Sequence, residues 1–151
     1  MRYVMSNKTE KLSSELNRAV IKYRSFYSAW AKHHGVNYNK MLVIYTVQDN
    51  GYCTQKQICE SYLLPKQTVN HVFVSMISEG ELVEAPECNT GREKAYVLSE
   101  KGLALAAPLL SSIGAVEENA ATAMGTEKLE QLTALITEYG ALLAKALEES
   151  K

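Results

Sequence analysis

The sequence is short of cysteine and proline and has no long apolar run, and each shortage narrows the class of protein. Its three cysteines, Cys53, Cys59 and Cys88, form no CxxC pair, so we expect reduced, inert thiols and no disulfide framework. A redox switch at one of them stays open as an alternative. No apolar run approaches the ~20 residues of a membrane span, and residues 1–10 lack the apolar stretch of a signal peptide. We therefore expect a cytoplasmic protein with no membrane partner.

Catalytic signatures are missing as well. The sequence has no GxSxG elbow, no Gly-rich phosphate loop and no HExxH motif. Its scattered Ser, His and Glu residues are explained by helix caps and by solvated surfaces. We therefore expect that the protein is not an enzyme and that it carries no cofactor.

The net charge of −1 is small, but the two signs are separated along the chain. Residues 1–40 contain eight Lys or Arg and two Glu, whereas residues 103–151 contain three Lys and seven Glu. These opposite charges would favour packing of the two ends against each other. Residues 51–102 contain five Lys or Arg and seven Glu, which weighs against very tight nonspecific binding to nucleic acid.

Heptad-like apolar seams indicate long helices at both ends of the chain. The first helix is predicted over residues 6–34 and ends at Gly35, and the second is predicted to begin at a cap on Thr126. Apolar positions spaced alternately by three and four residues are typical of helices that pack against a partner helix. The seam residues are Leu12, Leu16, Ala19, Tyr23, Phe26 and Trp30 in the first helix, and Leu129, Leu132, Ile136, Tyr139, Leu143 and Ala146 in the second. Because one subunit has little else to cover these seams, we predict a homodimer interface, with packing inside one subunit as the alternative.

Three shorter helices are predicted in the middle of the chain. Asn37 suits the N-cap of a helix that ends at residues 50–51, and Thr54 with Gln57 forms a T-x-x-Q capping box. Pro65 suits the first turn of the next helix. The apolar face predicted for that helix consists of Val69, Val72, Phe73, Met76 and Ile77. A short helix, a tight turn over residues 61–64 and an amphipathic helix together indicate a helix-turn-helix.

The pattern changes from helical to alternating after Gly80. Residues 81–85 and 94–98 are predicted strands, and the turn-rich segment 86–93 between them completes a β-hairpin. Ser99 suits the cap of a fifth helix, in which Pro108 should introduce a bend unless the helix restarts there. The fold class we expect is mainly α with a small β-hairpin wing, a winged helix-turn-helix flanked by N- and C-terminal helices.

Polar side chains on the predicted fourth helix and on the hairpin suit contacts with double-stranded DNA. An α-helix fits the major groove, where Gln67, Asn70 and His71 would supply donors and acceptors for base edges. Lys66 suits a phosphate or a guanine, and Arg92 at the wing tip suits the minor groove. The predicted DNA-binding residues are Thr54, Gln55, Lys56, Pro65, Lys66, Gln67, Thr68, Asn70, His71, Thr90, Arg92 and Lys94. An ordinary solvated helix face is the alternative interpretation.

These segments resemble a known family. The stretch TQKQICESYLLPKQTVNHVFVSMISEGELVE, residues 54–84, resembles the helix-turn-helix of MarR (multiple antibiotic resistance regulator) proteins. The stretch REKAYVLSEKG, residues 92–102, resembles the end of that family's wing and the start of its dimerisation helix, and APLL at residues 107–110 also fits. The resemblance covers nearly the whole chain in element order. Thr90 departs from it, because the family's wing often carries an Asp two residues before the tip Arg.

The resemblance implies a triangular homodimer that binds a pseudo-palindromic operator through two winged motifs. On that basis we expect one compact unit with a dimerisation helix over residues 1–35, a DNA-binding lobe over 36–99 and dimerisation helices over 100–151. Some relatives sense metals with several His or Cys ligands, partly on the fifth helix. His33 and His34, with Glu15 or Glu138, fall short of that set, so we expect no metal site.

The resemblance also implies an effector pocket between the dimer helices and the DNA-binding lobe. This chain is rich in aromatic residues near the junction of its first and second helices. The candidate pocket residues are Tyr23, Tyr27, Trp30, His34, Tyr38 and Tyr45. Core and rim residues with polar tips in water are the alternative interpretation. The function we expect is a sequence-specific DNA-binding transcription regulator, a repressor that a small aromatic ligand releases. The alternative is a dimeric winged-helix adaptor for proteins, which should expose apolar anchors on the fourth helix, where only Val74 qualifies.

Overall fold

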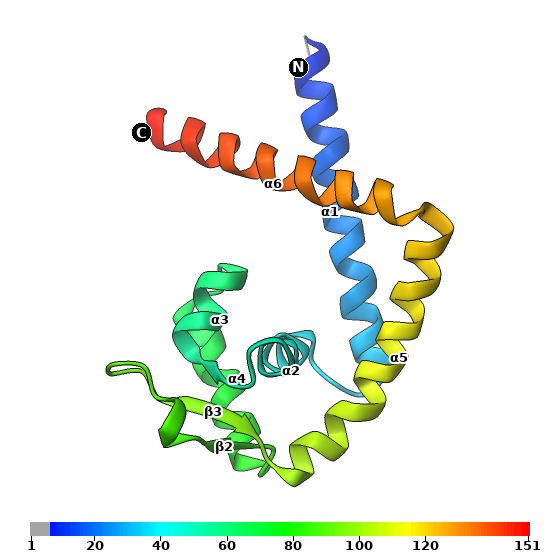
Figure 1. Cartoon of the computed structure of the whole chain (residues 1–151). Helices are drawn as coiled ribbons and strands as arrows, with labels where there is room; N and C mark the ends of the chain where they lie inside the picture. The colour runs from blue at the N-terminus through cyan, green and yellow to red at the C-terminus, as the bar shows by residue number, and fades with distance from the viewer. Residues whose placement is uncertain (1–6) are drawn as a thin grey trace, which may run out of the picture. The chain divides into compact units, whose positions relative to one another are not determined.

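A computed structural model describes residues 7–151, and helices dominate it (Figure 1). The elements are α1 (Lys8–His33), α2 (Tyr38–Asn50), β1 (Cys53–Thr54), α3 (Gln55–Tyr62), α4 (Lys66–Ser78), β2 (Leu82–Glu84), the 3-10 helix η1 (Pro86–Cys88), β3 (Ala95–Leu98), α5 (Glu100–Met124) and α6 (Thr126–Glu149). The predicted fold class, mainly α with a small β wing, is confirmed. The chain divides into two compact units, with the boundary after Ala106. Among residues 7–151, no helix combines the length and the apolar character that crossing a membrane requires.

Two helices of the first unit, α2 and α3, begin at the caps that the sequence predicts. The Asn37 side chain accepts a hydrogen bond of 2.7 Å from the Asn39 amide, which caps α2. At α3 the Thr54 hydroxyl accepts from the Gln57 amide at 3.1 Å, while the Gln57 side chain accepts from the Thr54 amide at 2.8 Å. Both halves of the capping box are therefore present. Since each such cap stabilises a helix by roughly 1 kcal/mol, these short helices have locally encoded starting points.

The start of α6 differs from the prediction. Thr126 is the first residue of that helix, and no side-chain hydrogen bond caps it. The N-cap is Gly125, whose φ of +97° lies in the left-handed region that side chains disfavour. The chain therefore passes from α5 into α6 through the conformational freedom of a glycine. At Pro108, α5 continues as one helix and does not restart.

The core of the first unit is formed by α2, α3, α4 and the sheet. Met41 and Ile44 of α2, Ile58 of α3 and Phe73 of α4 are at most 1% exposed. The Phe73 ring meets the Tyr96 ring of β3 edge-on, with the ring centroids 5.4 Å apart. This packing anchors α4 between the other helices and the wing.

The buried face of α4 is narrower than predicted. Val69, Phe73 and Met76 are at most 1% exposed, but Val72 is only half-buried. Ile77 was predicted to be buried, yet it is 43% exposed. The helical periodicity marks the correct side of α4, but the neighbouring elements cover only its central stripe.

The wing belongs to a three-stranded antiparallel sheet in the order β1-β3-β2. Leu82 pairs with Leu98 in the predicted hairpin, and Cys53 pairs with Tyr96 through β1. The sequence did not predict β1, which has two residues and depends on a partner far along the chain. Because β1 leads directly into α3, this pairing ties the start of the helix-turn-helix to the wing.

Candidate nucleic-acid interface

The polar face of α4 is fully presented to solvent. Lys66, Gln67, Asn70 and His71 are all exposed, and their spacing places them on one side of the helix. The opposite side of α4 packs into the core described above. The predicted base-reading side chains are therefore held on a rigid support, on the side of α4 that faces solvent.

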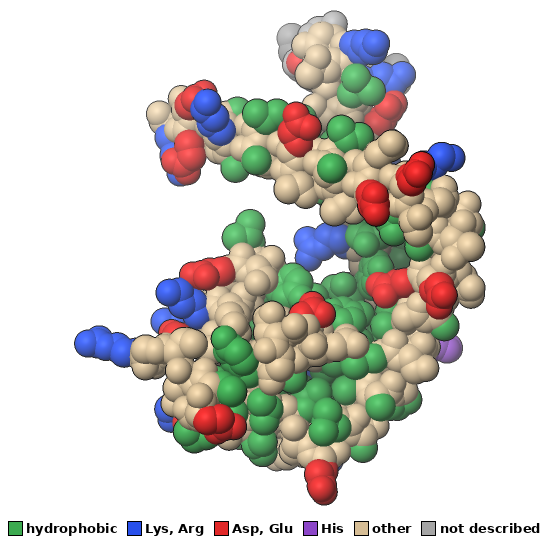
Figure 2. All heavy atoms as spheres, in the orientation of Figure 1, with side chains coloured by type: hydrophobic (Ala, Val, Ile, Leu, Met, Phe, Trp, Pro, Cys, Tyr) green, Lys and Arg blue, Asp and Glu red, His purple; other side chains and the backbone are tan. Residues whose placement is uncertain are grey.

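Basic side chains from three elements surround an open hollow beside α4. This hollow has a volume of about 780 Å³ and lies between α3, the start of α4 and the wing. Its lining includes all four predicted basic DNA contacts, Lys56, Lys66, Arg92 and Lys94. Figure 2 shows Lys and Arg side chains (blue) at the α3 and wing side of the molecule. Two carboxylates, Glu60 and Glu93, also line the hollow, so its four cations outnumber its anions although residues 51–102 carry a net negative charge.

These cations are available to an incoming anion. Lys56 lies 3.9 Å from Glu60 and Lys94 lies 3.9 Å from Glu84, and all four side chains are well exposed. Exposed ion pairs of this length contribute little free energy, so a phosphate can replace the carboxylate at small cost. Within residues 7–151, Lys66 and Arg92 form no ion pair. The hollow therefore suits the sugar-phosphate backbone of a nucleic acid.

A second hollow, of about 590 Å³, runs along α4 beside the start of α2. Its lining includes Asn37, the N-cap of α2, and Asn39, together with Gln67 and His71 of α4, and no Lys, Arg, Asp or Glu side chain lines it. Amide and imidazole groups both donate and accept hydrogen bonds. This side of α4 is therefore suited to hydrogen-bond recognition, whereas the first hollow is suited to charge.

Two of the predicted contact residues have structural roles. Thr54 is 2% exposed and its hydroxyl is engaged in the capping box, so its side chain supports α3 and does not reach the surface. Pro65 is the N-cap of α4, and its carbonyl accepts from the Val69 amide at 3.2 Å. Thr68 is half-buried. Thr90 is exposed but lines neither hollow. The other predicted contacts line the two hollows, namely Gln55, Lys56, Lys66, Gln67, Thr68, Asn70, His71, Arg92 and Lys94.

The wing tip is closed by its own backbone. The Thr90 amide donates to the Glu93 carbonyl at 3.2 Å, and the Glu93 amide donates back at 2.9 Å. Gly91, with a φ of +59°, makes the reversal possible. The Asn89 side chain accepts from the Ala95 amide at 2.8 Å and so orders the base of the tip. Arg92 therefore stands on a defined turn, although Thr90 occupies the position where the family often has an Asp.

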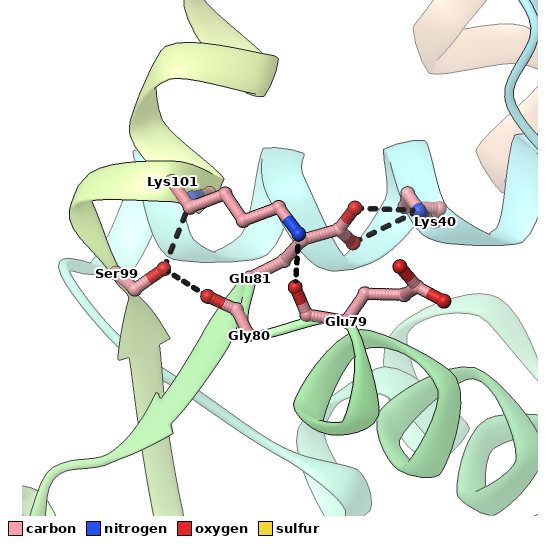
Figure 3. Close-up of polar contacts among 7 residues, drawn as sticks. Lys40, Glu79, Gly80, Glu81, Ser99 and Lys101 are labelled. Carbon is pink, nitrogen blue, oxygen red and sulfur yellow. Dashed lines mark hydrogen bonds and ion pairs between the residues drawn. The ribbon is translucent and has the colours of Figure 1, made fainter.

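Polar contacts fasten the C-terminal end of α4 to the first turn of α5 (Figure 3). The Lys101 ammonium donates to the Glu79 carbonyl at 2.6 Å. The Ser99 hydroxyl donates to the Gly80 carbonyl and accepts from the Gly102 amide at 3.0 Å, so Ser99 caps α5 as predicted. A Cβ on Gly102 would clash with the Glu81 carbonyl oxygen, so only glycine permits this close approach.

An ion pair connects the segment between α4 and β2 to α2. The Lys40 ammonium lies 2.9 Å from one Glu81 carboxylate oxygen and 3.2 Å from the other. The two side chains are only 18% and 9% exposed, so solvent screens this pair far less than the pairs of the wing. Together with the α5 contacts, the pair fixes the orientation of α4 within the first unit.

Five of the six predicted effector residues form two aromatic groups in the first unit, and the sixth, Tyr45, is half-buried on α2. Tyr27 contacts Tyr23 and Tyr38, with ring centroids 5.3 and 5.7 Å apart, and so links α1 to α2. Trp30 stacks on His34 at 4.4 Å. The Trp30 indole nitrogen is buried, and within residues 7–151 it has no hydrogen-bond partner. A buried donor without a partner is costly, so this N–H could be satisfied by an acceptor on a bound ligand.

The cysteines differ in their surroundings. Cys53 is buried in β1, and burial raises the pKa of its thiol to about 12. At neutral pH this thiol is protonated and therefore a poor nucleophile, which agrees with the expected inert cysteine. Cys59 and Cys88 are half-buried and unpaired. Within residues 7–151, no group of three His, Cys, Asp or Glu side chains is arranged to hold a metal ion.

An α3-turn-α4 pair followed by a β wing defines the class of protein, a winged helix-turn-helix. No protein-family model matches the chain, and no curated protein matches it. Among solved structures, a MarR family regulator from Neisseria meningitidis has 27% identity and a TM-score of 0.81, over 97% of this chain and 100% of that one. The two chains therefore share one fold over almost their whole lengths.

Two more distant structures show the same fold. NadR in complex with 4-hydroxyphenylacetate has 14% identity and a TM-score of 0.71, over 92% of this chain and 97% of that one. Bordetella bronchiseptica BpsR, whose DNA binding is regulated by 6-hydroxynicotinic acid, has 12% identity and a TM-score of 0.65, over 83% of this chain and 98% of that one. The predicted resemblance to the MarR family is confirmed, and the chain has the MarR winged-helix fold.

Proposed function

We propose that this chain is a homodimeric, sequence-specific regulator of transcription that represses by binding double-stranded DNA. The observation that carries the proposal is the exposed polar face of α4 beside a hollow that gathers Lys56, Lys66, Arg92 and Lys94. In this arrangement α4 enters the major groove and the wing reaches the adjacent minor groove. The MarR fold supports the proposal, since its solved relatives include transcription regulators.

A second copy of the chain would complete the site. The predicted seams are exposed, with Leu12 and Phe26 of α1 at 54% and 68%, and no residue of α6 is buried. Covering these apolar faces with a second copy supplies the favourable burial that they lack within one chain. A two-fold dimer would then place two α4 helices in successive major grooves, with centres about 34 Å apart, on a pseudo-palindromic operator.

We also propose that a small aromatic acid or phenol regulates DNA binding. The support is the aromatic group around Trp30 with its unpartnered indole N–H, and the ligand seen in the related NadR structure. A ligand that binds better to a conformation with the wrong spacing of the two α4 helices would lower the affinity for the operator. Addition of 4-hydroxyphenylacetate to the protein-operator complex tests this, because release of DNA is expected from the parent and not from a Trp30→Phe variant.

The first experiment is fluorescence anisotropy of the protein on a pool of promoter fragments at two salt concentrations. Saturable, selective binding with a steep salt dependence is expected. Gln67→Ala should relax the base preference at a cost of about 1–3 kcal/mol, whereas Gln131→Ala, an exposed glutamine on α6, should bind as the parent does. Unselective or absent binding by a verified dimer would contradict the proposal and favour a protein adaptor. The two exposed apolar residues of α4, Val74 and Ile77, would then be the first anchors to test.

A further inference from the structure

One side-chain hydrogen bond crosses the helix-turn-helix. The Gln55 side-chain amide, on the first residue of α3, donates from Nε2 to Oδ1 of Asn70 on α4 at 3.3 Å. Gln55 is half-buried and lines the hollow with the basic side chains, whereas Asn70 is exposed and lines the other hollow. The bond therefore lies between the two parts of the proposed interface, at a residue that the proposal assigns to base recognition.

This bond limits what Asn70 can present to a base. A primary amide accepts hydrogen bonds at its oxygen and donates two from its nitrogen, on opposite sides of the group. With Oδ1 turned toward Gln55, the Nδ2 amino group of Asn70 points away from α3 and offers donors. Bidentate recognition of adenine needs both Oδ1 and Nδ2 on the same base edge, so Oδ1 would have to accept from Gln55 and from the base at once.

We infer that Gln55 is a positioning residue that sets the base preference of Asn70. It holds the Asn70 amide with its donors toward the groove, so the operator position read by Asn70 carries a base edge that offers acceptors alone. In the major groove these bases are guanine, through O6 and N7, and thymine, through O4. The inference rests on the proposed DNA-binding function and deepens it by naming the recognition chemistry of one residue.

Substitution of Gln55 by Glu tests the inference sharply. A carboxylate only accepts, so Asn70 must turn Nδ2 toward residue 55 and present Oδ1 to the DNA. The preferred base should then change to one that offers a donor, the N6 amino group of adenine or the N4 amino group of cytosine. The helix should be retained, since a Glu in the first turn interacts favourably with the positive end of α3. Gln55→Ala should release Asn70 and flatten the preference.

The measurement has two stages. Duplexes selected from a randomised pool by the parent and by Asn70→Ala identify the position whose preference depends on Asn70. Anisotropy on four duplexes that differ only at that position then compares the parent with the Gln55 variants. The change in relative affinity between acceptor and donor bases should be about two- to tenfold, as expected for one exchanged hydrogen bond.

Lys56→Gln is the matched control, because it makes the same change of one charge unit at the neighbouring exposed residue. It should weaken binding to all four duplexes alike and leave their order unchanged. If Gln55→Glu keeps the parent's order, or if the parent prefers adenine or cytosine there, the inference fails while the proposed function stands. If the parent selects no sequence from the pool, both are overturned.

Discussion

The helices α4 and α6 are both amphipathic, but the chain covers the apolar face of only one of them. Val69, Phe73 and Met76 of α4 are at most 1% exposed, whereas Leu132, Ile136 and Leu143 of α6 are 44–47% exposed. Figure 2 shows the difference as hydrophobic side chains (green) standing at the surface along α6. The apolar face of α4, the helix proposed to bind DNA, is buried within the chain. The apolar face of α6 is exposed, which is typical of a surface that binds a partner.

The largest expected effect concerns the covered face of α4. Phe73→Ala removes a fully buried ring and its contact with Tyr96, so the free energy of unfolding should fall by about 3–5 kcal/mol. Val74→Ala, one residue along and 57% exposed, should change it by less than about 0.5 kcal/mol. Urea denaturation of both variants measures the difference. Equal losses would mean that α4 does not have the buried and exposed sides described here.

The next effect concerns what fixes the C-terminal end of α4. Lys40→Met leaves the Glu81 carboxylate, 9% exposed, without its cation. The expected loss of stability is about 2–3 kcal/mol, below the roughly 3–5 kcal/mol of a fully buried pair because Lys40 is 18% exposed. The double variant Lys40→Met, Glu81→Leu should recover most of the loss, since it removes both charges from the interior. Urea denaturation measures the free energy of unfolding of both variants. A double variant as unstable as the single one would contradict this account.

Shortening an apolar side chain in the α6 seam should weaken dimer formation. If a second copy covers Ile136, Ile136→Ala should raise the dimer dissociation constant about 30-fold or more, as for a central interface residue. Lys145→Ala, on the same helix but outside the seam, is the control and should leave the constant unchanged. Sedimentation equilibrium over a range of protein concentrations measures both. An unchanged constant for Ile136→Ala would show that the dimer, if one forms, does not use the seam.

The comparison of α4 and α6 also shows which features the sequence could predict. A local pattern predicted the start of α3, because Thr54 and Gln57 are three residues apart and form a capping box. The polar face of α4 could also be predicted from the sequence, since helical spacing alone places Asn70 and His71 on one side. The start of α6 could not, because the glycine conformation at Gly125 replaces the cap predicted at Thr126.

Features that depend on distant partners were beyond sequence reasoning. The strand β1 exists through pairing with β3, so two residues alone carried no strand signal. Lys40 and Glu81 are 41 positions apart, and Gln55 and Asn70 are 15 apart, so neither contact has a local pattern. Ile77 was assigned to the core because periodicity gives the direction of a face but not the width that neighbours cover. The candidate site could be predicted as a set of residues, but not as two hollows of different chemistry.

The smallest expected effect is on the salt dependence of DNA binding, and it compares the loss of one lysine from α4 with the loss of one from α6. Lys66→Ala removes a cation at the start of α4 beside the hollow between α3 and the wing, so it should lower the salt slope of operator binding by about one. Lys145→Ala removes the same charge from α6 and should leave the slope as it is, because the net charge of the protein alone does not release counterions from DNA. Anisotropy titrations at several salt concentrations give both slopes. Equal reductions would mean that overall charge, and not the placement of cations around α4, governs binding to the phosphate backbone.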